Sequence, residues 1–161
     1  MNTNTMFQQT YTSNPEDIVV LFVQAFNDRD AVALANLFVE DAEFVNVVGL
    51  WWHNRQAIWK AHDYGLKTIF NQSIVELRKV KIKLVTPEVA LVQARMKLTG
   101  QTAHADITQP QSRQNVISFV AYRQSLGWVA VSAHNTDIIP GKETNIVDES
   151  GNITSVDYRE Q

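Results

Sequence analysis

Residues 42–52 read AEFVNVVGLWW, and this stretch decides how the chain is organised. Its first half has the alternating β-branched and aromatic residues of a strand, with Asn46 among them. Gly49 indicates a turn, and Trp51 and Trp52 follow it directly. An amide and two indoles next to a turn, followed by a helix with one histidine, are typical of a small-molecule pocket.

The segment after the tryptophans predicts a helix that begins near Asn54 and ends near Phe70. Ile58, His62 and Leu66 recur at four-residue spacing, so they share one face of that helix. That face is otherwise apolar. His62 is therefore either a core histidine with both nitrogens paired or a pocket histidine with an ordinary pKa of about 6.5, suited to acid–base work.

Two further helices are predicted before residue 42. Asn14 can cap the first, Pro15 fits its first position, and apolar residues continue at helical spacing to residue 26. Asp30 can cap a second, short helix that carries Leu34, Leu37 and Phe38. The chain thus opens with two helices, a strand and a third helix.

Strands replace helices after residue 70. Residues 73–85 alternate, but the phase slips near Arg78 and Lys79, which a β-bulge would explain. A turn leads to a partner strand over 89–98, and a polar loop over 99–112 precedes a last hairpin over 113–135. This order predicts an α+β fold with helices packed on one face of a curved antiparallel sheet.

Composition narrows the class of protein. The 161 residues suit one domain, predicted over 14–138 after a polar tail over 1–13. A net charge of −3 gives no electrostatic reason to expect nucleic acid or an anionic membrane as partner. There is no cysteine, no basic and apolar leader, and no apolar run long enough to cross a bilayer. We expect a cytoplasmic protein.

Several stretches resemble a known family. They are Phe44-Val45-Asn46-Val47-Val48-Gly49, Ala61-His62, Thr86-Pro87-Glu88-Val89-Ala90-Leu91-Val92 and Ala133-His134-Asn135-Thr136. With the order of elements, they are similar to the SnoaL-like group of the nuclear-transport-factor-two-like superfamily, and most of all to its SgcJ/EcaC family. The resemblance covers roughly residues 14–138. It implies a cone-shaped, cystatin-like barrel with a pocket between the sheet and the helices, usually in a dimer.

The resemblance does not extend to the catalytic mechanism of the ketosteroid isomerases. In the similar ketosteroid isomerases the strand after the helical pair holds a catalytic aspartate, and that position falls on Asn46 here. An amide cannot abstract a proton, although it can donate or accept a hydrogen bond. The first helix offers Phe22 and Phe26 where those enzymes have a tyrosine. Asn46 is therefore either a pocket donor or an amide paired with backbone at the strand end.

The last predicted strand adds His134 and Asn135, of which a regular strand can turn only one toward a pocket. The sequence does not decide which. Trp51 and Trp52 either rim the pocket and bind a flat ligand, or divide between core and interface. Arg113, beside the polar loop, could hold an anionic group.

Three functions remain open at this level. An isomerase, cyclase or lyase would use His62 or His134 as its acid–base group, with Asn46 as a hydrogen-bond donor. A non-catalytic protein would bind a small, mostly apolar ligand in the same pocket. An assembly or accessory domain would have a filled pocket and an apolar outer surface. The four histidines lack metal-ligand spacing and no nucleotide motif is present, so we expect neither metal nor cofactor.

Two expectations concern assembly. Residues 115–122 and 128–133 are apolar in both phases, so the outer face of the sheet should also be covered, most simply in a homodimer. Residues 139–161 form an extension in which two β-prone runs flank a loop with Gly151. We expect a hairpin there that docks on its own barrel or on a partner subunit, with a frayed polar tail as the alternative.

Overall fold

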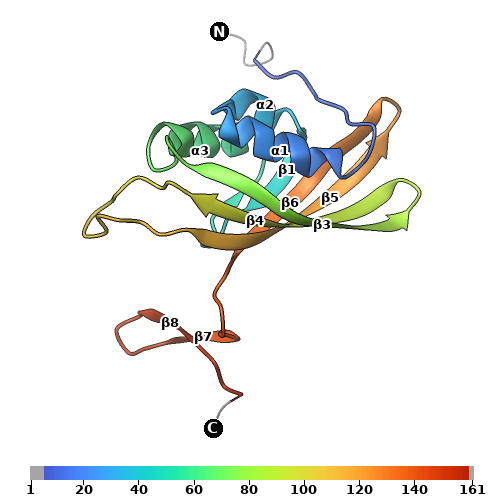
Figure 1. Cartoon of the computed structure of the whole chain (residues 1–161). Coiled ribbons are helices and arrows are strands. Elements are labelled where there is room, and N and C mark those ends of the chain that lie inside the picture. Colours follow the sequence, from blue (N-terminus) through green and yellow to red (C-terminus); the bar gives the residue numbers. More distant parts are fainter. Residues whose placement is uncertain (1–5, 160–161) are drawn as a thin grey trace.

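Three helices lie on the concave face of a curved sheet in the computed structural model, which describes residues 6–159 (Figure 1). They are α1 (Asp17–Asn27), α2 (Ala31–Ala35) and α3 (Arg55–Lys67). Asp30 and Asn54 cap α2 and α3 as expected, because their side chains accept hydrogen bonds from the backbone N–H groups of Ala33 and Ala57. The α+β class, with helices on one sheet face, is confirmed.

The start of α1 differs from the expectation. Asn14 does not cap the helix; instead its backbone N–H donates to the carboxylate of Asp17 at 3.1 Å. The helix accordingly begins at Asp17, after a turn. The carboxylate lies in the first helical turn, where the positive end of the helix dipole favours it.

Six strands form the main sheet in the order β2-β1-β6-β5-β4-β3. Their bounds are β1 (Phe38–Val45), β2 (Trp51–Trp52), β3 (Ile74–Thr86), β4 (Val89–Thr99), β5 (Arg113–Gln124) and β6 (Gly127–Ile138). All neighbours are antiparallel except β1 and β6, which are parallel. The predicted antiparallel pairing therefore holds at every other pair, and β1 and β6 are parallel because β1 joins the sheet beside a strand from the far end of the chain.

The first strand begins and ends earlier than the sequence indicated. Phe38, assigned to the second helix by its spacing, is the first residue of β1 and pairs with Ala130. The backbone N–H of Ala130 donates to the carbonyl of Leu37 at 2.9 Å, so pairing with β6 overrides helical periodicity here. At the other end, β1 stops at Val45, and Asn46 belongs to the following turn.

Four register shifts interrupt the pairing in the main sheet, and two of them bear on the predictions from the sequence. The slip in β3 lies between Leu77 and Lys79, as the sequence predicted. A second shift lies between β5 and β6: Val120 pairs with Ser132 and Ala121 with Ala130, so Val131 of β6 is the extra residue. Such shifts exchange the inward and outward phases of a strand. This second shift changes the phase of β6 alone, whereas β5 alternates regularly and keeps Val116 and Val120 on the outer face.

Four phenylalanines join the layers. The ring of Phe22 on α1 lies 5.4 Å from that of Phe119 on β5, measured between centroids. Phe38 on β1 contacts Phe44 at 5.8 Å and Phe119 at 6.1 Å. All four rings are at most 5% exposed, so they form the centre of the hydrophobic core.

Part of the predicted N-terminal tail packs on the domain. Thr12 is buried and forms a β-bridge with Trp128, and the backbone N–H of Thr10 donates to Asn36 at 2.8 Å. Gly127 permits this close approach, since a Cβ there would lie 2.5 Å from the carbonyl oxygen of Thr12 and its φ is +138°. Residues 1–5 of the predicted tail lie outside the described residues.

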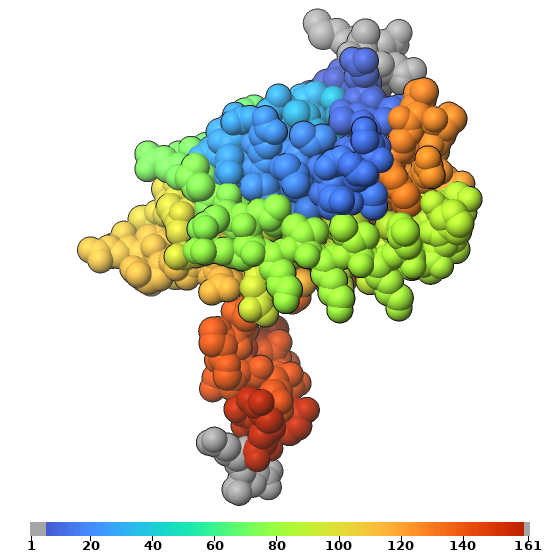
Figure 2. Space-filling view, turned by 45° about the vertical axis from the view of Figure 1, so that its right-hand side comes forward, coloured from blue at the N-terminus to red at the C-terminus, as the bar shows by residue number. Residues whose placement is uncertain are grey.

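The C-terminal extension forms a hairpin of β7 (Thr144–Val147) and β8 (Ile153–Val156). Asp148 orders its turn by accepting hydrogen bonds from the backbone N–H groups of Ser150 and Asn152 at 2.8 and 2.9 Å. The hairpin stands away from the domain, on the side opposite the helices (Figures 1 and 2). It therefore does not dock on its own barrel.

Candidate functional site

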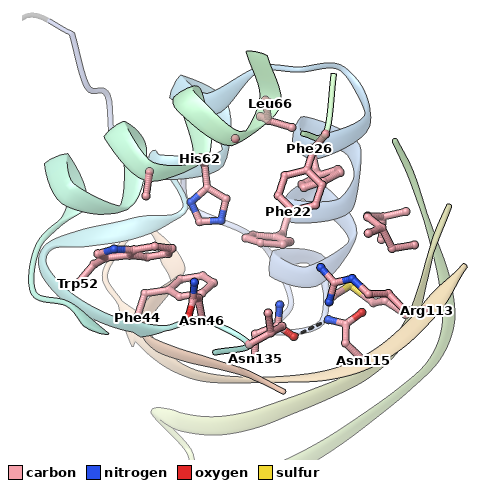
Figure 3. Close-up of a pocket in the computed structure, with 17 residues that line it drawn as sticks. Phe22, Phe26, Phe44, Asn46, Trp52, His62, Leu66, Arg113, Asn115 and Asn135 are labelled. Carbon is pink, nitrogen blue, oxygen red and sulfur yellow. Dashed lines mark hydrogen bonds between the residues drawn. The ribbon is translucent and has the colours of Figure 1, made fainter. Parts of the chain in front are cut away.

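A cavity of about 130 Å³ lies between α1, α3 and the concave face of the sheet (Figure 3). Its walls are mostly aromatic and aliphatic, and polar groups occur at a few places. The polar lining residues are Asn46, His62, Arg113, Asn115 and Asn135. A largely apolar cavity with a few convergent polar groups is the usual form of a small-ligand site.

His62 points from α3 into this cavity (Figure 3). Aromatic rings surround it: the centroids of Phe44, Trp52 and Phe22 lie 5.2, 5.5 and 5.9 Å from the imidazole, all edge to face. Its Nδ1 lies 2.8 Å from the carbonyl oxygen of Ile58. A carbonyl only accepts, so the ring proton is on Nδ1, and Nε2 keeps a free lone pair for a ligand.

The protonation state of His62 follows from its surroundings. Burial lowers the pKa of His62 to about 4, and the hydrogen bond to Ile58 opposes this only in part. The imidazole is therefore neutral at physiological pH. Protonating it at pH 7 would cost about 4 kcal/mol, so the ordinary histidine pKa expected from the sequence does not apply.

Asn46 holds the turn that closes this side of the cavity. Its Oδ1 accepts hydrogen bonds from the backbone N–H groups of Leu50 at 2.8 Å and Val48 at 3.1 Å. Gly49 completes the turn with a φ of +89°. Both interpretations of Asn46 therefore hold in part, because Oδ1 is paired with backbone while the residue lines the cavity. Within the described chain its Nδ2 has no hydrogen-bond acceptor, which leaves a donor for a ligand.

The other polar groups lie on β5 and β6, across the cavity from His62 (Figure 3). Arg113 forms an ion pair with Asp137, and its Nε donates to Gln101 at 3.2 Å. Asn115, which is buried, donates from its Nδ2 to Oδ1 of Asn135. Because Asp137 balances the charge of Arg113, this end of the cavity suits a neutral polar group better than an anion.

The sequence left open which of His134 and Asn135 faces the cavity, and the structure selects Asn135. His134 is exposed on the outer face of the sheet, where it pairs with Ser118 of β5. The alternation of β6 separates the two side chains onto opposite faces. A role for His134 as a pocket base is therefore not supported.

The two tryptophans also separate. Trp52 lines the cavity, and its ring lies 5.3 Å from that of Phe44. Trp51 is 60% exposed and packs on His53, with centroids 4.7 Å apart, outside the cavity. Only one indole of the pair can therefore contact a ligand in this cavity.

A family model described as a SnoaL-like domain matches residues 16–139. This chain belongs to the SnoaL-like domain family. The matched range contains every residue that lines the cavity. No curated protein sequence matches the chain.

Solved structures agree with the fold of this SnoaL-like domain. An uncharacterised protein with a cystatin-like fold from Caulobacter vibrioides is 27% identical over 77% of this chain and 87% of its own, with a TM-score of 0.71. An NTF2-like protein with a cystatin-like fold from Novosphingobium aromaticivorans is 17% identical over 84% and 82%, with a TM-score of 0.65. A ketosteroid isomerase-like protein from Erwinia carotovora atroseptica is 14% identical over 78% and 95%, with a TM-score of 0.65.

Sequence reasoning missed part of the SnoaL-like site. Asn115 and Asp137 were not selected, although they form the polar end of the site with Arg113 and Asn135. Asn115 could have been found, because it shares a strand phase with Ile117 and Phe119, and asparagine is uncommon in strand interiors. Asp137 lies beyond the predicted end of the last strand and gave no such signal.

Among residues 6–159, no group of three or more histidine and acidic side chains could hold a metal ion. No helix in this range is long and apolar enough to cross a membrane.

The low pKa of His62 predicts a pH dependence of stability. In the unfolded chain His62 binds a proton below about pH 6.5, whereas the folded pKa is about 4. The unfolded state therefore gains the proton first, and between these pH values the free energy of unfolding should fall by about 3 kcal/mol as pH decreases. Denaturant unfolding of His62→Gln over this range should lack that part of the slope.

The matched control is Leu66→Met, which changes the same helix face without removing a titratable group. It should keep the slope of the unaltered protein. Identical slopes for His62→Gln and the unaltered protein would mean that His62 titrates as an exposed histidine does.

Proposed function

We propose that this SnoaL-like domain binds one small, mostly apolar molecule that carries a hydrogen-bond donor at one end and a neutral acceptor at the other. The free Nε2 of neutral His62, enclosed by aromatic rings, is the observation that carries the proposal. Nε2 faces the cavity and has no partner among the described residues, so a ligand that donates a hydrogen bond can pair with it in place of water. Arg113 supplies a donor for the opposite end of the ligand, and Asn46 supplies one on the His62 side of the cavity.

The size of the cavity supports a ligand with a single ring. At about 130 Å³, it is close to the roughly 150 Å³ of an engineered apolar cavity that binds benzene. A fused four-ring molecule would not fit without opening the helix layer. The walls formed by Phe44 and Trp52 are suited to a flat aromatic face.

Proton transfer is a second candidate, favoured by the same Nε2 atom. An unprotonated imidazole that faces Asn46 and Arg113 could take a proton from a substrate whose developing negative charge those donors stabilise. The low pKa of His62 weakens it as a base, which is why binding is the first proposal. An assembly domain with a filled pocket is less well supported, since the cavity is open.

The proposal includes self-association. Val120 and Tyr122 are 37% and 42% exposed on the outer face of the sheet, the side opposite the helices. A second copy laid on this face would cover them, so we propose a homodimer. The SgcJ/EcaC affiliation and the cytoplasmic location remain predictions from the sequence.

Binding can be tested with two matched probes. 4-Hydroxybenzaldehyde has a hydroxyl donor and a carbonyl acceptor on one ring, and 4-methylbenzaldehyde lacks the donor. We expect the hydroxyl compound to bind about tenfold more tightly, because it pairs His62 Nε2. Titration followed by Trp52 indole shifts in NMR spectra would measure both affinities.

His62→Leu should remove this preference, whereas His53→Leu, outside the cavity, should retain it. Equal affinities of the unaltered protein for both probes, or a preference that survives His62→Leu, would contradict the proposed role of His62.

The catalytic candidate makes a different prediction. In any reaction found for this protein, His62→Gln should lower kcat by about 100-fold or more with little change in Tm. The rate of the unaltered enzyme should fall on the acid side near pH 4, because the pKa of His62 is about 4 in the free protein. An unchanged rate, or an acid limb that persists in His62→Gln, would exclude His62 as the base.

Sedimentation equilibrium tests the dimer. At micromolar concentration we expect twice the monomer mass, with an interface above about 1,000 Å². Val120→Asp, which introduces an unpaired charge on the outer face, should shift the protein toward monomer, whereas Val20→Asp, on the exposed face of α1, should not. A purely monomeric unaltered protein would contradict the dimer.

A further inference from the structure

The hairpin of residues 139–159, here called the C-terminal arm, has apolar side chains that nothing in its own molecule covers. Val147 and Ile153 lie opposite each other across the hairpin and are 64% and 70% exposed. Tyr158 is 62% exposed. A two-stranded hairpin alone in water is marginally stable. The arm therefore needs a surface to pack on.

The outer face of β3 and β4 carries a group of basic residues that lack acidic partners among residues 6–159. Lys79 lies directly opposite Arg95, and Lys81 and Lys83 continue in the same outward phase. Like charges opposite each other in a sheet are destabilising. None of these four has a carboxylate ion-pair partner within residues 6–159. We call them the basic row.

The charges of the two surfaces are opposite. Residues 74–99 hold six basic and two acidic side chains, whereas the arm holds four acidic and two basic ones. Two of the arm's acidic residues, Glu143 and Asp157, share Arg159. The other two, Asp148 and Glu149, lie at the hairpin tip and form no ion pair among the described residues.

The position of the arm points to a second molecule. It leaves β6 at Ile138 and extends from the outer side of the sheet (Figure 1). Side chains of the yellow-green segment near residue 80 project on the same side (Figure 2). In its own molecule the arm points away from these side chains, so a copy approaching the outer face would meet the arm.

We propose that the C-terminal arm of one copy packs on the outer face of β3 and β4 of a second copy. Asp148 and Glu149 at the arm tip face the basic row, and Val147 and Ile153 cover apolar surface. This rests on the proposed homodimer and adds to it a reciprocal exchange of arms. Desolvation of Val147 and Ile153 stabilises the contact, while the charges set its position and its dependence on salt.

Cross-linking between copies tests the exchange, and the chain offers a clean background because it has no cysteine. Glu149→Cys and Lys81→Cys are purified separately, one with a mass tag, then mixed and oxidised. We expect a mixed disulfide dimer in about tenfold higher yield than from Glu149→Cys with Lys60→Cys, a control lysine on the helix layer. Equal yields would overturn the proposal.

A variant with both cysteines in one chain distinguishes exchange of arms between copies from docking of the arm on its own sheet. If Glu149→Cys and Lys81→Cys in one chain form a bridge at monomer mass in dilute solution, the arm docks on its own sheet and the proposal is wrong. A bridge found only at dimer mass supports exchange.

Charge reversal gives an independent measurement in the full chain. Lys81→Glu with Lys83→Glu should weaken the dimer about tenfold at low salt, and Glu149→Lys, which leaves the turn-forming Asp148 intact, should restore part of it. A stable dimer that neither change affects, without the mixed cross-link, would overturn the arm exchange and leave the dimer intact. A monomer at all concentrations would overturn both.

Discussion

The contact of four phenylalanine rings between α1, β1 and β5 is the interaction on which the rest of the structure depends. Phe22 and Phe44 belong both to this cluster and to the cavity wall. The curved sheet and the helices meet tightly at these rings, and the cavity is the space left beyond them. Loss of a large core ring typically costs about 3–5 kcal/mol. The same packing therefore stabilises the fold and limits the size of the cavity.

The apolar surroundings also determine the chemistry of the site. They keep His62 neutral, and the Ile58 carbonyl places its proton on Nδ1. A histidine thus becomes a fixed hydrogen-bond acceptor. Arg113 is affected in a comparable way, because Asp137 balances its charge before any ligand arrives. His62 and Arg113 therefore favour recognition of neutral polar atoms. The low pKa of His62 also makes it a weak general base.

The outer face of the sheet leaves apolar side chains exposed and like charges close together. Exposed valine and tyrosine side chains lie near a row of lysines and an arginine, and the acidic arm extends from the same side of the sheet. Packing of the arm of a second copy on this face would cover the apolar side chains and place acidic residues beside the basic row. Cavity and outer face are separated by the thickness of the sheet, so ligand binding and association can be altered by separate substitutions.

The sequence by itself determined the order of the elements, the caps of two helices, the bulge in β3, the C-terminal hairpin and the placement of His62 on an apolar helix face. These are local features, set by periodicity and by the hydrogen-bonding of single residues. Asn46 and Trp52 were also predicted at the pocket, because both lie close to the turn at Gly49 in the sequence.

Only the tertiary structure decided the rest, because the rest depends on contacts between distant segments. Pairing with β6 moved Phe38 from a helix into a strand and made one strand pair parallel. The shift opposite Val120 belongs to the pairing of β5 with β6, and the alternation of β6 turned Asn135 inward and His134 outward. The pKa of His62 depends on rings from α1, β1 and β2 that close around it. No local pattern records that enclosure, because burial is a property of the whole packed chain.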